Sequence, residues 1–196
     1  MLCPNWGYRL AHNNLSSAGI VELARGLAAT TSLLELDLTY VPVDDEGAAA
    51  LADAVAEHAS LRVLKLYKCQ IGDDGVRELM ATLGDSNRTV TTLDLGANRF
   101  GSDAVASIAH AVSANTVEEL GLVGNDLRGS DAEVIAAALV DNTALRRLYI
   151  YGNFDIILDQ IAHISPAPHH LARAVRHAPL RDHAARMLTV AWNPML

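Results

Sequence analysis

Three groups of residues in this chain could do chemistry of their own: one cysteine, paired aspartates and a cluster of histidines. Cys69 stands among aliphatic residues in the stretch LRVLKLYKCQI. A cysteine nucleophile needs a base that takes its proton, and no neighbouring pattern of residues supplies one. The sequence therefore predicts that Cys69 has a structural role and not a catalytic one.

The aspartate pairs recur at a fixed point of the chain. Asp44-Asp45 and Asp73-Asp74 each come directly before a stretch of helical period. Carboxylates in that position favour the positive end of a helix. We therefore interpret both pairs as helix caps and not as general acid–base pairs.

Most of the histidines lie near the C-terminus, in a segment that also contains three prolines. They are His163, His169, His170, His177 and His183. Zinc ligands usually come at tighter and more regular spacings. We expect a polar face on a capping element here and no metal site.

Composition excludes several classes of function. The net charge of −8 argues against general nucleic-acid binding. No apolar run approaches the roughly 18 residues of a membrane span, and two cysteines, Cys3 and Cys69, favour a reducing compartment such as the cytoplasm. Phosphate-loop, nucleophile-elbow and zinc-protease motifs do not occur. We predict no cofactor and no enzymatic activity.

The elements that position these residues repeat along the chain. Equivalent stretches start at Leu33, Leu61, Val90, Val117 and Leu145, and YRLAHNNL continues the phase toward the N-terminus, which gives six units of about 28 residues. Each follows the pattern L-x-x-L-x-L-x-x-N-x-L, and we number the places of a unit from its start. The alternation at places 4 and 6 predicts a short strand with one buried side.

The second half of each unit changes period. Pairs such as Leu51 and Val55, or Leu79 and Leu83, are four residues apart, which indicates a helix. Neighbouring strands sit about 4.8 Å apart, whereas packed helices need about 8–10 Å. The stack must therefore curve into an α/β horseshoe with a parallel sheet inside and helices outside.

The unit length and the G-x-x-x-L-A-x-x-L helical half resemble the ribonuclease-inhibitor-like class of leucine-rich repeats, over roughly residues 5–155. That class also includes the repeat domains of NOD-like receptors and Ran GTPase-activating protein. The resemblance implies the same solenoid fold, but it says little about function, because the class is defined by how its leucines pack.

Place 9 follows the strand, where the backbone turns into the middle of the coil. A buried amide there can satisfy both N–H and C=O groups of the turn. The predicted structural ladder is Asn13, Cys69, Asn98, Asn125 and Asn153. Cysteine is a replacement that ribonuclease-inhibitor-like repeats often show. Val41 takes this place in the second unit, followed by Pro42, and can donate nothing.

Places 3, 5, 7 and 8 are expected to face the concave side, and four of the five tyrosines occupy them. Tyr8 alone takes a core place. Tyrosine and arginine anchor protein interfaces, although tyrosine is also simply a good strand residue. The aromatic and basic residues at these places form two clusters. The N-terminal cluster is Tyr40, Lys65, Tyr67 and Lys68, and the C-terminal cluster is Arg147, Tyr149 and Tyr151. The small residues Gly96, Ala97, Gly121 and Gly124 separate them. The predicted partner-binding residues are Tyr40, Lys65, Tyr67, Lys68, Asp94, Arg147, Tyr149 and Tyr151.

Both ends depart from the pattern. We expect residues 1–155 to form the repeats and residues 156–196 to form a capping segment of the same domain. No comparable cap precedes the first unit. The strand of the first unit should therefore present an open edge. Either the chain is a piece of a longer protein, or a partner covers this edge. Self-association through the edge is also expected.

The sequence thus predicts a non-enzymatic scaffold that binds a protein partner on its concave face in the cytoplasm. The basic residues beside the tyrosines predict a partner with an acidic surface. Two alternatives stay open: a GTPase-activating regulator of the Ran GTPase-activating type, and the ligand-sensing repeat region of an innate-immune-type receptor.

Overall fold

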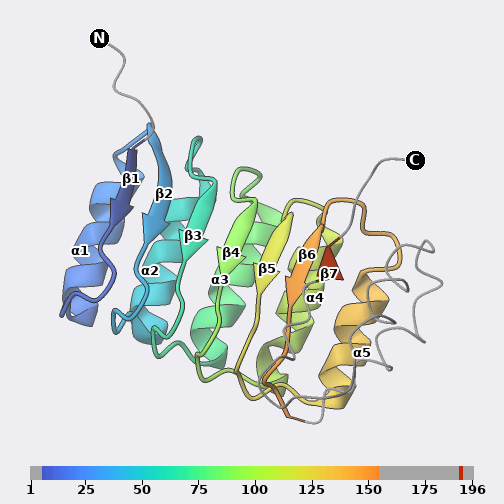
Figure 1. The fold of residues 1–196 in the computed structure, drawn as a ribbon. Helices are drawn as coiled ribbons and strands as arrows, with labels where there is room; N and C mark the ends of the chain where they lie inside the picture. Colours follow the sequence, from blue (N-terminus) through green and yellow to red (C-terminus); the bar gives the residue numbers. More distant parts are fainter. Residues whose placement is uncertain (1–5, 155–189, 192–196) are drawn as a thin grey trace.

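Strands and helices alternate in a computed structural model that describes residues 6–154 and 190–191 of the chain. The strands form one layer and the helices lie behind it in a second layer (Figure 1). The strands are β1 (Trp6–Arg9), β2 (Leu33–Asp37), β3 (Val63–Lys65), β4 (Thr92–Asp94), β5 (Glu119–Gly121), β6 (Arg147–Tyr149) and β7 (Val190–Ala191). The helices are α1 (Ser17–Ala28), α2 (Asp44–Ala56), α3 (Asp73–Asp85), η1 (Ser102–Ala104), α4 (Val105–Ser113) and α5 (Gly129–Ala138).

The sheet follows chain order from β1 to β7, and β1 to β6 are parallel. Place 4 of each unit pairs with place 4 of the next, as Leu36 does with Leu64 and Leu64 with Leu93. All these leucines are buried, with at most 5% of any of them exposed. The predicted α/β leucine-rich-repeat solenoid is confirmed, and equivalent places of consecutive units pair across its strands.

The helical halves bury the side chains that their four-residue spacing predicts. Leu51 and Val55 of α2 and Leu79 and Leu83 of α3 are each 2% exposed or less. Consecutive helices pack against one another, from α1 on α2 to α4 on α5. Since helices need more room than strands, the sheet is the concave side of the stack.

The aspartate pairs act at helix starts, but they partly serve the next repeat. The Oδ1 atom of Asp45 accepts hydrogen bonds from the backbone N–H groups of Gly72 (2.6 Å) and Gly75 (3.1 Å), at the start of α3. Asp73 Oδ1 accepts from the N–H of Gly101 at 2.9 Å. These carboxylates therefore tie neighbouring repeats together on the helical side.

Tyr8 corrects one expectation about the core. It pairs with Leu36 as its place requires, yet it is 52% exposed. The reason is that, among the described residues, β1 has a neighbouring strand on one side only. Tyr8 therefore packs against one coil, where the leucines pack between two.

The predicted capping segment, residues 156–196 with its five histidines, lies outside the described residues except for β7. The backbone of β7 pairs antiparallel with β6, with Leu148 opposite Val190. Residues 1–5 also lie outside the described part. Within residues 6–154 and 190–191, no helix has the length and apolar character needed to cross a membrane.

Candidate functional site

The turn that follows each strand holds the concave surface in place, and Asn98 shows how it is built. Its Oδ1 accepts from the backbone N–H groups of Cys69 (2.9 Å) and Ile71 (3.1 Å) of the preceding unit. Its Nδ2 donates to the carbonyls of Leu66 (2.8 Å) and Leu95 (2.9 Å). One buried amide thus bonds two consecutive units at the point where their backbones leave the sheet.

Asn153 makes the same full set of bonds, with its Nδ2 donating to the carbonyls of Leu122 (2.9 Å) and Ile150 (2.7 Å), whereas Asn125 and Asn13 make part of it. Asn153 Oδ1 accepts from the N–H groups of Asn125 (3.0 Å) and Leu127 (3.3 Å). The Nδ2 of Asn125 donates to the carbonyls of Leu95 and Leu122, both at 3.1 Å, while its buried Oδ1 accepts no hydrogen bond within the described residues. Asn13 is exposed and bonds the Leu10 carbonyl at 2.7 Å.

Cys69 supplies only the donor half of this arrangement. Its Sγ donates to the Leu38 carbonyl at 3.1 Å, which is the bond that Asn98 Nδ2 makes one unit later. Burial raises the pKa of the Cys69 thiol to about 12, so it stays protonated at neutral pH. Val41 has no polar side chain, and its own N–H bonds the Leu38 carbonyl at 2.9 Å.

A second set of capping side chains, which the sequence analysis did not identify, lies three residues before the start of three of the units. His58 Nδ1 accepts from the N–H groups of Ser60 (3.3 Å) and Leu61 (3.1 Å). Asn87 Oδ1 accepts from Val90 N–H at 2.9 Å, and Asn142 Oδ1 from Leu145 N–H at 2.7 Å. The signal was a polar residue at the same place before these three units.

Place 8, on the concave rim, has the same unusual backbone in every unit. His12, Tyr40, Lys68 and Ala97 have φ values of 60°, 63°, 55° and 54°, and glycines hold this left-handed conformation in the last two units. A non-glycine residue there costs about 1–2 kcal/mol. Backbone strain of this kind motivates the hypothesis that a side chain is retained there for binding.

The N-terminal cluster is a stack of side chains along this rim. The rings of His12 and Tyr40 are stacked with centroids 4.4 Å apart. Tyr67 lies beside Tyr40 at 5.8 Å, and the Lys68 ammonium stands 5.0 Å from the centre of the Tyr40 ring. Tyr40 remains 42% exposed, so the stack presents aromatic surface to solvent.

The C-terminal cluster is held by Glu119 of β5. Its Oε2 accepts from Arg147 (2.7 Å from Nη2), and its Oε1 accepts from the Tyr149 hydroxyl at 3.0 Å. Burial and the Glu119 carboxylate raise the pKa of Tyr149 above its ordinary value, so the phenol stays protonated. Both oxygens of this carboxylate are therefore occupied, and the Tyr149 ring is fixed.

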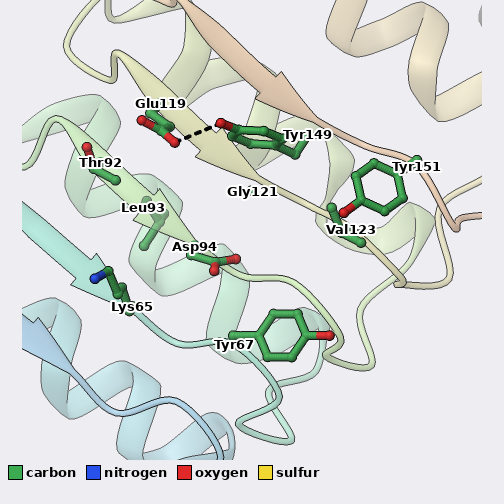
Figure 2. Close-up of a pocket in the computed structure, with 10 residues that line it drawn as sticks. All are labelled: Lys65, Tyr67, Thr92, Leu93, Asp94, Glu119, Gly121, Val123, Tyr149 and Tyr151. Atoms are coloured by element: carbon green, nitrogen blue, oxygen red, sulfur yellow. Dashed lines mark hydrogen bonds between the residues drawn. The ribbon is translucent and has the colours of Figure 1, made fainter. Parts of the chain in front are cut away.

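Between the two clusters the surface is hollowed, with a volume of about 320 Å³. Figure 2 shows Asp94 between Tyr67 on one side and Tyr149 on the other, with Tyr151 beyond. Small residues make this space. A Cβ on Gly96 would stand 2.8 Å from Cδ2 of Tyr67, and one on Gly121 would stand 2.6 Å from Oδ1 of Asp94.

Asp94 is the partly buried acid of the hollow. Its Oδ1 accepts from Gly96 N–H at 2.9 Å. Burial raises the pKa of Asp94 despite that bond and despite the nearby Lys65 ammonium, which lowers it, and the carboxylates of Asp37 and Glu119 act in the same direction as burial. None of the ion pairs within the described residues involves Asp94.

Two of the three basic residues that were predicted to bind a partner have carboxylate neighbours. Lys65 Nζ lies 2.6 Å from Glu35 Oε1, and Arg147 pairs with Glu119. Lys68 differs, since its ammonium lies over the Tyr40 ring. Within the described ranges, no three His, Cys, Asp or Glu residues are grouped so that they could hold a metal ion.

Comparisons with known proteins agree with this architecture. A family model described as "Leucine Rich repeat" matches residues 30–52, 57–80 and 86–109. "NACHT, LRR and PYD domains-containing protein 13" of Homo sapiens is 30% identical over 141 residues, which are 71% of this chain and 14% of that protein. "NACHT, LRR and PYD domains-containing protein 12" of Mus musculus is 34% identical over 142 residues, 71% of this chain and 13% of that protein.

Ribonuclease inhibitor of Sus scrofa is 26% identical over 148 residues, 74% of this chain and 32% of that protein. The chain therefore spans about a third or less of each of these relatives. Among solved structures, "Leiomodin-1 Actin-Binding Site 2 (ABS2)" aligns with a TM-score of 0.49 and 21% identity, over 59% of this chain and 66% of that one.

Proposed function

We propose that this chain, a leucine-rich-repeat protein of the ribonuclease-inhibitor-like class, is a non-enzymatic scaffold that binds a protein partner on its concave face. The observation that carries the proposal is the hollow between β3 and β6, where Tyr67, Tyr149 and Tyr151 surround glycine-lined space. Rigid tyrosines around a recess are typical anchors of protein interfaces.

Two further facts support a binding role. Ribonuclease inhibitor is, by its name, a protein that acts on another protein. The rim residues Tyr40 and Lys68 hold a left-handed backbone that glycine adopts at lower cost. A side chain kept at such a place contributes something other than stability, and partner contact is the contribution that its exposure allows.

The acidic partner surface that the sequence predicts is supported at one place only. Lys65 and Arg147 already have carboxylate partners on the neighbouring strand, Glu35 and Glu119. Lys68 is exposed beside the stacked rings and is available to a carboxylate. We therefore limit the acidic contact to the Lys68 rim and propose that it steers association in a salt-dependent way.

Site-specific photo-crosslinking tests the proposal. A photoreactive phenylalanine at Val123, inside the hollow, should crosslink a protein from native lysate, while one at Glu133 on the outer helix α5 should not. Tyr67→Ala and Tyr149→Ala should then weaken binding of the captured protein by about 2 kcal/mol each, with Glu78→Ala as the outer-face control. Capture from Glu133, or unchanged binding by both tyrosine variants, contradicts the proposal.

A second candidate function follows from the relatives that contain NACHT and PYD domains. In that case the chain is the ligand-sensing repeat region of an innate-immune-type receptor. A nucleotide-binding sequence upstream in the same gene supports this alternative, and its absence from a full-length transcript removes it. The concave face is the binding surface in both cases.

Self-association remains a proposal about β1. This strand lies at the end of the sheet order within the described residues, and an open strand edge can pair with another chain. Sedimentation at several protein concentrations should show concentration-dependent dimers. The buffer should be reducing, to match the predicted cytoplasmic localisation. A monomer at every concentration excludes pairing through this edge.

A further inference from the structure

The charges in the hollow do not cancel. Three charged residues line it: Lys65, Asp94 and Glu119. Lys65 bonds Glu35, and Glu119 bonds Arg147 and Tyr149. Among the described residues, Asp94 accepts a hydrogen bond only from the neutral Gly96 N–H, and the Lys65 ammonium favours its charged form without making an ion pair with it. One partly buried negative charge therefore remains at the centre of the recess, with a pKa raised by burial.

The surroundings of this carboxylate are aromatic. Tyr67 approaches from the turn after β3, and Tyr149 and Tyr151 approach from β6 and the turn after it (Figure 2). The face of a tyrosine ring carries negative electrostatic potential and attracts cations. A carboxylate flanked by such rings disfavours an anionic guest and favours a cationic one, which the partly buried setting strengthens.

The glycines keep the carboxylate accessible. A side chain on Gly121 would stand 2.6 Å from Asp94 Oδ1, in the place where a guest must approach. The hollow of about 320 Å³ has room for one long side chain and not for a folded segment. Its shape and its charge thus select the same kind of group.

We propose that the hollow receives a cationic side chain of the partner, an arginine or lysine, which ion-pairs with Asp94 and lies between the rings of Tyr67 and Tyr149. This inference rests on the proposed function, because it identifies what the partner inserts into the concave face. It places a basic anchor at the centre of the contact and leaves the Lys68 rim to acidic groups.

The test uses a small cationic probe and a neutral analogue of the same shape. N-acetyl-arginine amide and N-acetyl-citrulline amide are titrated separately into ¹⁵N-labelled protein, and the backbone amide signals of Gly96 and Gly121 are followed. The arginine compound should shift both signals in a saturable way, and the citrulline compound should bind at least about fivefold more weakly. Raising the salt concentration should weaken only the arginine compound.

Asp94→Asn is the decisive variant, because asparagine keeps the shape and can still accept from Gly96 N–H. It should weaken the arginine compound by at least about fivefold and leave the citrulline compound unchanged. Asp103→Asn, an exposed aspartate of η1 on the helical side, should change nothing. Equal binding of the two compounds, or full arginine binding by Asp94→Asn, overturns the inference.

The two proposals can fail separately. If Val123 crosslinks a protein while the arginine compound does not bind, the basic anchor is wrong and the concave interface stands. If the arginine compound binds in an Asp94-dependent way while only Glu133 crosslinks, the hollow's preference stands and the proposed interface is wrong.

Discussion

The ring of Tyr67 lies against Gly96 of the next unit, so close that a Cβ on residue 96 would stand 2.8 Å from the ring's Cδ2 atom. Gly96→Val should therefore push the ring out of the hollow. The displaced ring lines the hollow and does not belong to the buried core, so we expect the variant to lose less than about 1.5 kcal/mol in stability. Its affinity for the crosslinked partner should fall by about tenfold.

Calorimetric titration and urea unfolding of the same samples measure both effects. Gly26→Ala is the control, since a Cβ there meets nothing within 4 Å, and it should raise stability by up to about 1 kcal/mol with no change in binding. Undiminished affinity in Gly96→Val means that the position of Tyr67 is irrelevant to the partner.

Replacing Asn98 tests the ladder. Asn98→Val leaves the buried N–H groups of Cys69 and Ile71 without acceptors and removes the donor to Leu66 and Leu95. Each unmet buried group costs about 1–3 kcal/mol, so the total loss should be about 3 kcal/mol or more. Urea denaturation followed by circular dichroism measures it.

Asn13→Ala is the matched control, because Asn13 is exposed and bonds carbonyls of its own unit only. It should cost less than about 1 kcal/mol. Equal losses in the two variants would show that the bonds between units add nothing.

The Cys69 thiol should be chemically silent in the folded protein. Its pKa of about 12 leaves almost no thiolate near pH 8, and the side chain is fully buried. In a Cys3→Ser background, where Cys69 is the remaining thiol, iodoacetamide should label the chain only in urea. Mass spectrometry of the native and unfolded samples decides, and rapid native labelling refutes the prediction.

His58 should make stability sensitive to acid. Burial lowers its pKa below the ordinary 6.5, and Nδ1 must be deprotonated to accept from Ser60 and Leu61. A lowered folded-state pKa gives a contribution that is present above the unfolded value and is lost as the pH falls through the folded value. The wild type should therefore lose stability below about pH 6.5.

His58→Asn places the residue type of Asn87 at this turn and keeps an acceptor without a titrating group. Unfolding free energies at several pH values between about 7 and 5 should fall more steeply for the wild type than for this variant. Parallel curves would mean that His58 is not the group responsible.

The fold could be predicted from the sequence because the strand sequence repeats in every unit. Leu36, Leu64 and Leu93 recur at one place, and the register of a parallel stack then follows from the repeat itself. The repetition also explains why Asn98 and Asn153 could be assigned to the turn, since their side-chain amides form hydrogen bonds with equivalent backbone groups in the two units.

The site was less predictable because it depends on pairs of residues in neighbouring units. Lys65 and Arg147 were interpreted as basic residues that attract an acidic partner, although Glu35 and Glu119 stand beside them one strand away. Matching place 5 of one unit to place 3 of the previous unit would have indicated the Lys65 pair. The exposure of Tyr8 could not be found this way, because its place is that of a core leucine.

The left-handed rim of place 8 divides the array into four units that carry this backbone cost and two that do not. Its first four units carry His12, Tyr40, Lys68 and Ala97 in a conformation that favours glycine, and its last two carry glycine itself. In a repeat array such costs act on one coil and its neighbours. Hydrogen-exchange protection should therefore rise along the chain from β1 toward β5, so the array opens from its N-terminal end. The end that displays the stacked rings is then also the end that can most easily adjust its shape to a partner.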